Sequence, residues 1–137
     1  MDDKKKILFL CTHNAARSQM AEGLINAMYD DTYEAFSAGT YPTELHPCAV
    51  AVMAEVAIDI SAQRAKPFHE YLNASFDYVV TMSADAQENC PIFPGGAEYL
   101  HHAFVNPGSI PAPDNDRCAS GRHVRDQIEE WLRETFG

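Results

Sequence analysis

The sequence predicts an α/β fold with a four-stranded parallel sheet and helices on both of its faces. Short apolar runs alternate along the chain with patterns of helical periodicity, which is typical of a parallel sheet wrapped by helices. Residues 78–82 are apolar enough to be covered on both faces. The length of 137 residues and the apolar fraction of 46% fit one domain with a single core, spanning residues 1–137.

The elements follow in order along the chain. Strands are predicted at residues 6–10, 33–37, 78–82 and 98–104. Helices are predicted at residues 18–29 and 47–56, with a short one at 67–73 and a last one near the C-terminus. The first carries an apolar stripe of Met20, Ala21, Leu24, Ile25 and Met28, and the last one of Val124, Ile128, Trp131 and Leu132. Residues 106–119, rich in Pro, Asp and Gly, form either a mobile loop over the site or a surface excursion.

The composition excludes several classes of partner. A net charge of −10 argues against binding nucleic acid or acidic membranes. No stretch approaches 18 apolar residues, and the N-terminus has no pattern of a signal peptide. Four scattered cysteines in such a chain are expected to be reduced thiols. We therefore expect a cytoplasmic protein, and a monomer.

The most informative motif is the segment from Cys11 to Ser18, which directly follows the first predicted strand. A helix beginning near Ser18 points its free N–H groups and the positive end of its dipole at this loop. Arg17 adds a planar fork that matches two oxygens of a tetrahedral oxyanion. The loop predicts a cysteine nucleophile beside bound arsenate, phosphate or sulfate. Backbone N–H groups that should converge on the anion belong to Thr12, His13, Asn14, Ala15, Ala16 and Arg17.

The same positive environment is expected to favour the thiolate of Cys11. Cysteines so placed have their pKa lowered from ~8.5 to about 3.5–7.5. The hydroxyl of Ser18 could donate to the Cys11 sulfur and also cap the helix.

The segment from Cys11 to Gly23, with the sequence CTHNAARSQMAEG, resembles the low-molecular-weight protein tyrosine phosphatase superfamily, most closely its thioredoxin-coupled arsenate reductase branch. The similarity extends along nearly the whole chain and implies the flavodoxin-like architecture of that family, with Cys11 as the nucleophile. Other stretches that look like the branch are FSAG at 36–39, HP at 46–47, EVAIDIS at 55–61, DYVVT at 77–81, CP at 90–91 and VRD at 124–126.

One departure from the family pattern concerns the general acid. In the resembling families an Asp followed by Pro protonates the leaving oxygen, and here the dipeptide is Asn106-Pro107. An amide can donate a hydrogen bond but cannot transfer a proton. Asp114 or Asp116 on the same loop could substitute, although both are better interpreted as solvated loop carboxylates.

A second departure concerns the thiols. In the resembling reductases a thiol just after the central strand attacks the arseno-adduct, and a third thiol takes over the disulfide. Ser83 stands at the first of these positions, and Cys90 matches the other. Either Cys90 attacks directly, or an external thiol such as glutathione or mycothiol does so, or turnover is poor. Cys118 is another candidate resolving thiol but is better interpreted as an incidental surface cysteine, and Cys48 as a core residue.

Supporting residues follow from the resemblance. Asn14 would adopt a left-handed conformation. Glu22 and Ser37 match residues that hydrogen-bond Asn14 and, in some reductases, help to bind a potassium ion. His13 could shield the pocket mouth, add charge at low pH or simply be exposed. No tightly bound cofactor and no metal site are expected, because the sequence lacks zinc-ligand spacing and adjacent His101 and His102 would point to opposite faces of a strand.

The function that the sequence favours is arsenate reduction through a Cys11 arseno-adduct. It would draw electrons from an external thiol reductant of the thioredoxin or glutathione–glutaredoxin type, through a redox partner protein. The first alternative is phosphatase action on phosphotyrosine or small aryl phosphates, which suffers more from the loss of an acid at Asn106. The second alternative is a non-catalytic oxyanion binder or sensor.

Overall fold

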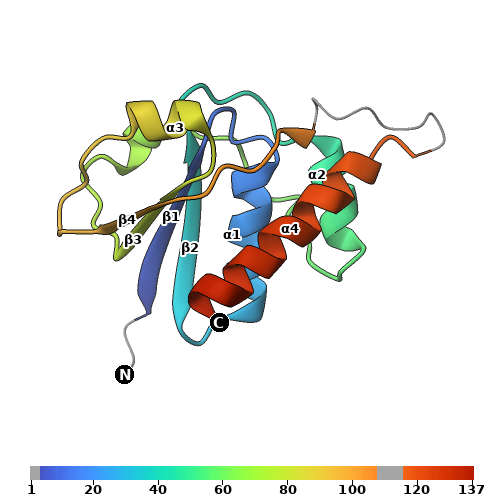
Figure 1. Cartoon of the computed structure of the whole chain (residues 1–137), viewed down its shortest axis with the longest axis horizontal. Coiled ribbons are helices and arrows are strands. Elements are labelled where there is room, and N and C mark those ends of the chain that lie inside the picture. The colour runs from blue at the N-terminus through green and yellow to red at the C-terminus, as the bar shows by residue number, and fades with distance from the viewer. Residues whose placement is uncertain (1–3, 108–115) are drawn as a thin grey trace.

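The computed structural model describes residues 4–107 and 116–137 (Figure 1). Its centre is a parallel sheet with the strand order β2-β1-β3-β4. The strands are β1 (Lys5–Cys11), β2 (Tyr33–Gly39), β3 (Tyr78–Thr81) and β4 (Glu98–His101). The predicted four-stranded parallel sheet is therefore confirmed.

The helices also agree with the prediction except for one that was not predicted, and one strand is shorter than predicted. They are α1 (Arg17–Met28), α2 (Pro47–Ala54), the 3₁₀ turn η1 (Phe68–Tyr71), α3 (Ala84–Asn89) and α4 (Ala119–Phe136). Helix α3 is absent from the sequence-based prediction because it is short, and Ser83 begins it as an N-cap that accepts the Ala86 N–H. Strand β4 ends at His101 rather than at residue 104, and the apolar Phe104 beyond it is buried among the helices instead.

The two faces of the sheet bury different cores, and β1 contributes to both. Side chains alternate along a strand, so Ile7, Phe9 and Cys11 face one side while Leu8 and Leu10 face the other. The first side is covered by α1, α2 and α4, and the second by η1, α3 and the segments beside them. Cys11 therefore lies on the face that carries the three larger helices (Figure 1).

Helices α2 and α4 are tied together by ion pairs near the end of α2. Glu55 Oε2 lies 2.7 Å from Arg122 Nη2, and Glu55 Oε1 lies 3.0 Å from Arg125 Nη1. The buried Arg125 also donates to Val52 O at 2.7 Å. Hydrogen bonding to Arg122, with help from Arg125, lowers the pKa of the Glu55 carboxyl to about 2. This end of α2 is therefore anchored on α4 by side chains of both helices.

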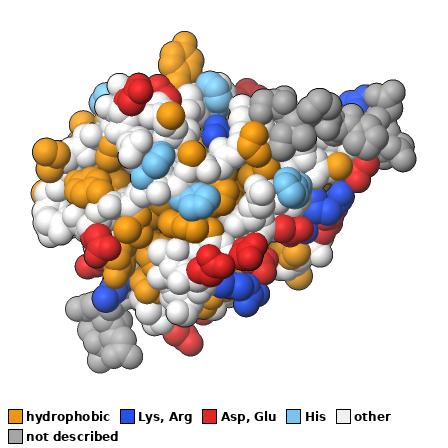
Figure 2. Space-filling model, viewed as in Figure 1, with side chains coloured by type: hydrophobic (Ala, Val, Ile, Leu, Met, Phe, Trp, Pro, Cys, Tyr) orange, Lys and Arg blue, Asp and Glu red, His pale blue; other side chains and the backbone are white. Residues whose placement is uncertain are grey.

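The surface matches the acidic composition. In the view of Figure 2 acidic side chains are spread across the face that carries α4, and Lys and Arg form only small separate groups. This face offers no continuous basic area for a polyanion. Within residues 4–107 and 116–137, no helix combines the length and the apolar character that crossing a membrane requires.

We predict that Gly23→Ala destabilises the protein although alanine favours helix. A Cβ atom at Gly23 in α1 would lie 2.6 Å from Ile60 Cγ2 and 3.2 Å from Met53 Cε. Overpacking of this kind costs about 1–3 kcal/mol. Urea unfolding followed by circular dichroism should show the lower midpoint.

The matched control is the same substitution in α4. At Gly121 the nearest atom to a new Cβ is Val52 Cγ1 at 3.7 Å, an ordinary contact. Gly121→Ala should therefore raise the free energy of unfolding by up to ~1 kcal/mol, the difference in helix propensity. If both variants were equally destabilised, the close approach of α1 to Ile60 would not be what requires a glycine.

Candidate active site

The loop between β1 and α1 is shaped by hydrogen bonds from the chain that follows β2. Residues 40–46 run beside this loop and bond its carbonyl groups. The bonds are Thr40 N to Cys11 O (3.1 Å), Tyr41 N to Thr12 O (2.8 Å), Thr43 N to His13 O (3.1 Å) and His46 N to Ala15 O (2.9 Å). In a trans peptide the next N–H points the opposite way from the carbonyl. The N–H groups of residues 12, 13, 14 and 16 are thus turned toward the other side of the loop.

Asn14 holds the tight bend of this loop in a left-handed conformation, with φ of 50°, as expected from the sequence. Its fully buried side chain donates to Ser18 Oγ at 2.7 Å and accepts from Gln19 Nε2 at 3.1 Å and from Lys66 N at 2.9 Å. Gln19 Nε2 also donates to the Asn14 carbonyl at 2.9 Å. Buried polar groups that are all bonded fix the loop backbone rigidly.

The expectation that Glu22 and Ser37 bond to Asn14 is wrong. Ser37 Oγ donates instead to Glu22 Oε1 at 2.6 Å, and Lys66 Nζ lies 3.9 Å from the same carboxylate. Burial raises the pKa of Glu22 and lowers the pKa of Lys66. The backbone N–H of Lys66 donates to Asn14 instead of Glu22 or Ser37 bonding to it, and the Lys66 ammonium lies beside Glu22.

Cys11 ends β1 and is 2% exposed. Burial raises the pKa of its thiol, while Arg17, the backbone N–H groups of Thr12 and Ser18 and the hydroxyl of Ser83 act to lower it. The net direction is upward, opposite to the expected lowering, because the charged sulfur would lose its water. The side-chain hydroxyl that faces the sulfur belongs to Ser83, which also lies 3.0 Å from Thr12 Oγ1.

Ser18 therefore has a different place from the one predicted. Its side chain is fully buried and accepts the Asn14 amide, and α1 begins after Ala16 without a side-chain cap. The cysteine receives the Ser18 backbone N–H rather than its hydroxyl.

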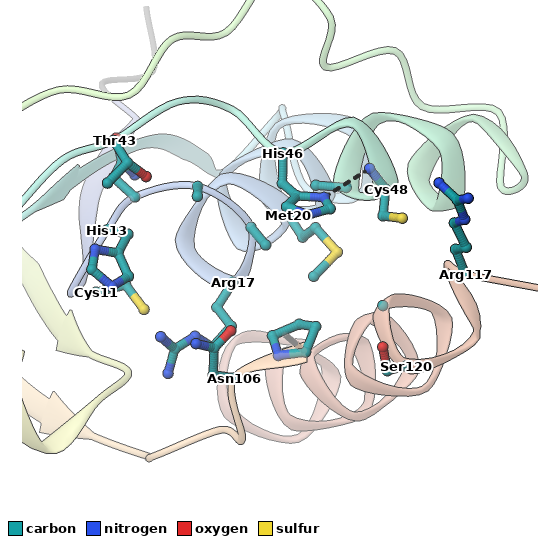
Figure 3. A pocket seen from close by; sticks show the side chains of 16 residues that line it. Cys11, His13, Arg17, Met20, Thr43, His46, Cys48, Asn106, Arg117 and Ser120 are labelled. Atoms are coloured by element: carbon teal, nitrogen blue, oxygen red, sulfur yellow. Dashed lines mark hydrogen bonds between the residues drawn. The ribbon is translucent and has the colours of Figure 1, made fainter. Parts of the chain in front are cut away.

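Arg17 is buried at the start of α1, and its Nη1 donates to Phe104 O at 3.0 Å. This bond fixes the plane of the guanidinium against the segment that follows β4. That segment continues to Asn106, and Figure 3 shows Asn106 next to Arg17 at the cavity. Asn106, which the resemblance places where the family has an acid, is thus an amide that faces the same space as the cysteine.

The cavity at the loop has a volume of about 400 Å³ (Figure 3). Cys11, Arg17 and Asn106 lie on its walls together with His13, whose Nδ1 donates to Tyr41 O at 3.1 Å. Because a carbonyl can only accept, Nδ1 of His13 carries a proton. The remaining lining residues include His46, Cys48 and Ala49 from the start of α2, and Arg117, Ser120 and Gly121 from the start of α4.

The structure overturns the interpretation of Cys48 and Cys118. They form a disulfide, with their Cα atoms 5.2 Å apart across 70 residues of sequence. Cys48 is thus not simply a core residue, Cys118 is not incidental, and these two thiols are not reduced. Their separation in sequence hid the pairing, which depends on how α2 and α4 pack.

Cys90 does not share the cavity with Cys11. It follows α3, packs against the cluster on the opposite face of the sheet and contacts Pro91 O through its sulfur at 3.4 Å. Burial raises the pKa of its thiol. Cys11 and Cys90 are the free cysteines of the described chain, and they lie on different faces of the sheet.

The alternative acids receive little support. Asp116 is bound by Arg122 Nη1 at 2.8 Å, and Asp114 lies outside the described residues. The described part of the chain contains no group of three or more His, Cys, Asp or Glu side chains suited to a metal ion. Sequence reasoning missed Gln19, Lys66 and the hydrogen-bonding role of Ser83. Only for Ser83 did a signal exist, its place directly after the central strand.

Comparison with known proteins places this geometry in a family. The model of the low molecular weight phosphotyrosine protein phosphatase family matches residues 6–136. The chain is 39% identical over 131 residues to an arsenate reductase of Halalkalibacterium halodurans, covering 96% of this chain and 94% of that protein.

Solved structures agree with this assignment. An arsenate reductase in the phosphate-binding state has a TM-score of 0.75 and 27% identity, covering 96% of this chain and 95% of that one. The thioredoxin-dependent arsenate reductase of Corynebacterium glutamicum has a TM-score of 0.78 and 28% identity, over 98% of this chain and 61% of that one. The protein described here belongs to the low molecular weight phosphotyrosine protein phosphatase family.

Proposed function

We propose that this protein reduces arsenate to arsenite, with Cys11 as the nucleophile. The observation that carries the proposal is the cavity that joins Cys11 and Arg17 to an amide, Asn106, at the position of the acid. The similarity to arsenate reductases over nearly the whole chain supports it. The same cavity would also hold phosphate or sulfate, which have the same tetrahedral shape.

Arsenate would bind with its oxygens against the inward N–H groups of residues 12, 13, 14 and 16. The Arg17 fork, held in plane by Phe104 O, would bind two of these oxygens with its other nitrogens. Asn106 would donate a hydrogen bond from its amide. No metal is required for this binding, and Lys66 supplies the cation beside Glu22 that potassium would otherwise supply.

The raised pKa of Cys11 suggests how the first step is balanced. A Cys11 thiol gives its proton to an arsenate oxygen as the sulfur attacks arsenic. A sulfur–arsenic bond forms, an arsenic–oxygen bond breaks, and water leaves. In the resembling families an aspartic acid supplies this proton. Here it would come from the Cys11 thiol itself, so Asn106 only needs to donate a hydrogen bond from its amide. A phosphotyrosine ester has a phenoxide leaving group, which needs a proton from an acid as it departs. Loss of the acid is therefore more harmful to phosphatase action.

The second step needs another thiol, which attacks the Cys11 sulfur. The electron pair of the sulfur–arsenic bond passes to arsenic, and arsenite leaves. The resulting disulfide must be reduced from outside, and we propose a dithiol protein of the thioredoxin class, present in the cytoplasm. The similarity to a thioredoxin-dependent reductase supports this choice over glutathione with glutaredoxin.

The central test is arsenite production from arsenate with thioredoxin, with glutathione–glutaredoxin and with neither. Turnover is expected with thioredoxin and should vanish in Cys11→Ser. Arg17→Lys keeps the charge but loses the fork, so kcat/KM should fall about 10²-fold or more. Equal rates in sodium and potassium salts are expected, because the Lys66 ammonium already supplies a cation beside Glu22 and no potassium ion is needed there.

Binding of arsenate without turnover under every condition would instead indicate the oxyanion binder or sensor. Melting temperatures of both variants serve as the control, since Arg17 is buried and its loss could perturb the fold.

We predict that iodoacetamide labelling of Cys11 in the oxyanion-free protein requires alkaline pH. Only the thiolate reacts, and a raised pKa means that the thiolate appears at higher pH than in an ordinary thiol. Ser83→Ala removes a donor that lowers this pKa, so the midpoint should move further upward. Ser83→Thr retains the hydroxyl and is the matched control.

The measurement is mass spectrometry of labelled peptides across a pH series. It is made in Cys90→Ser protein so that Cys11 is the free thiol that reacts. Full labelling near pH 6 would contradict the prediction and restore the low pKa expected from the sequence.

Phosphatase activity tests the acid position. Asn106→Asp should raise turnover of p-nitrophenyl phosphate by about 10²-fold, the usual scale of general acid catalysis. Asn106→Ala is the control and should give no gain. An unchanged rate in Asn106→Asp would show that another group already supplies the proton.

A further inference from the structure

We propose that Cys48 and Cys118 are the dithiol that resolves the Cys11 adduct and passes its electrons to arsenate. This inference rests on the proposed arsenate reductase function and assigns the second and third thiols to residues that family patterns do not indicate. The Cys48–Cys118 disulfide is then the oxidised product of one turnover, and an external reductant must reduce it before the next.

The location of Cys48 favours this role. Cys48 lines the same cavity as Cys11 and Arg17. Figure 3 shows Cys11 and Cys48 apart along this cavity, with Met20 between them and Arg117 beyond Cys48. The two positions of the family pattern cannot supply this thiol, because Ser83 has no sulfur and Cys90 packs on the other face of the sheet.

A short hydrogen-bonded connection joins Cys48 to the Cys11 loop. His46 N donates to Ala15 O of the Cys11 loop at 2.9 Å. The side chain of His46 accepts the Cys48 N–H through Nδ1 at 3.0 Å. The start of α2 is therefore bonded directly to the loop that would bind arsenate, four residues from Cys11.

The positions of the two sulfurs at helix starts favour their reactivity. Cys48 lies in the first turn of α2, and Cys118 is the N-cap residue of α4. Free N–H groups and the dipole at a helix start favour a thiolate, and Arg117 adds a positive charge beside Cys118. A stabilised thiolate attacks at neutral pH and is also a good leaving group in thiol–disulfide exchange. A disulfide in a cytoplasmic protein is in most cases transient and catalytic.

The start of α2 can move while its other end stays fixed. Reduction of the disulfide would release Cys48 from α4, whose first turn keeps its bonds through Arg122 to Asp116 and Glu55. The other end of α2 stays anchored through Glu55 and Val52 to Arg122 and Arg125. Cys48 can then approach Cys11 across the cavity while the helix pair remains assembled.

The proposed relay has three steps. The Cys48 thiol attacks the Cys11 sulfur of the adduct, a Cys11–Cys48 disulfide forms, and arsenite leaves with the electron pair and the thiol proton. The Cys118 thiol attacks Cys48, the Cys48–Cys118 disulfide forms, and Cys11 returns to the thiol. A thioredoxin-class dithiol then reduces the half-buried Cys48–Cys118 bridge and is itself oxidised to a disulfide.

The decisive experiment is a single turnover without external reductant. The protein is reduced with dithiothreitol, desalted, and mixed with arsenate, and arsenite and disulfides are measured by mass spectrometry. Wild type should give about one arsenite per chain and a Cys48–Cys118 disulfide. Cys118→Ser should stop as a Cys11–Cys48 disulfide, and Cys48→Ser should yield at least 10-fold less arsenite.

Steady-state assays with thioredoxin complete the test. Cys48→Ser and Cys118→Ser should each lower turnover at least 10-fold, and Ala119→Ser, a neighbouring change that leaves the thiols intact, should not. The melting temperature of each variant is compared with that of the reduced wild type to exclude unfolding.

Two results would overturn the relay. One is full activity in the double variant Cys48→Ser/Cys118→Ser, and the other is a Cys11–Cys90 disulfide in wild type. In either case arsenate would still be reduced, so the proposed function would stand. Absence of arsenite from wild type with every donor would contradict the proposed function itself.

Discussion

The outward bonding of the loop carbonyls is the constraint on which the rest of the site depends. Residues 40–46 bind the carbonyl groups after β1, and each trans peptide then turns its N–H the other way. Asn14, left-handed and fully bonded, keeps the bend from relaxing. These bonds hold the loop N–H groups in place, so oxyanion binding would require little rearrangement of the protein.

The alternation of side chains along β1 decides which cysteines lie on the same face of the sheet as Cys11. Cys11 faces the layer of α1, α2 and α4, so its cavity opens between the starts of those helices. Cys90, after α3, packs on the opposite face of the sheet, whereas Cys48, at the start of α2, lines the cavity and is bonded to Cys118 at the start of α4. The chain has kept the nucleophile of its family and carries a second pair of sulfurs on the nucleophile's own side.

The helper positions show how one fold adjusts its chemistry. Ser83 caps α3 and directs a hydroxyl at Cys11, where a thiol was expected. Lys66 places an ammonium 3.9 Å from Glu22 Oε1. Asn106 faces the cavity as an amide, so a proton for the leaving oxygen must come from elsewhere. The change at Asn106 is the one that fits arsenate best, because the leaving group is then water.

The sequence by itself determined the parallel sheet, its helices and the Cys11 loop. These are local in origin: apolar runs, helical periodicity and a Cys-to-Arg spacing on one short segment. The tertiary structure decided the rest, because it depends on which faces meet. The Cys48–Cys118 pairing, the exclusion of Cys90, the raised pKa of Cys11 and the place of Lys66 arise from segments far apart in sequence. Burial and helix packing set these, and no local pattern encodes them.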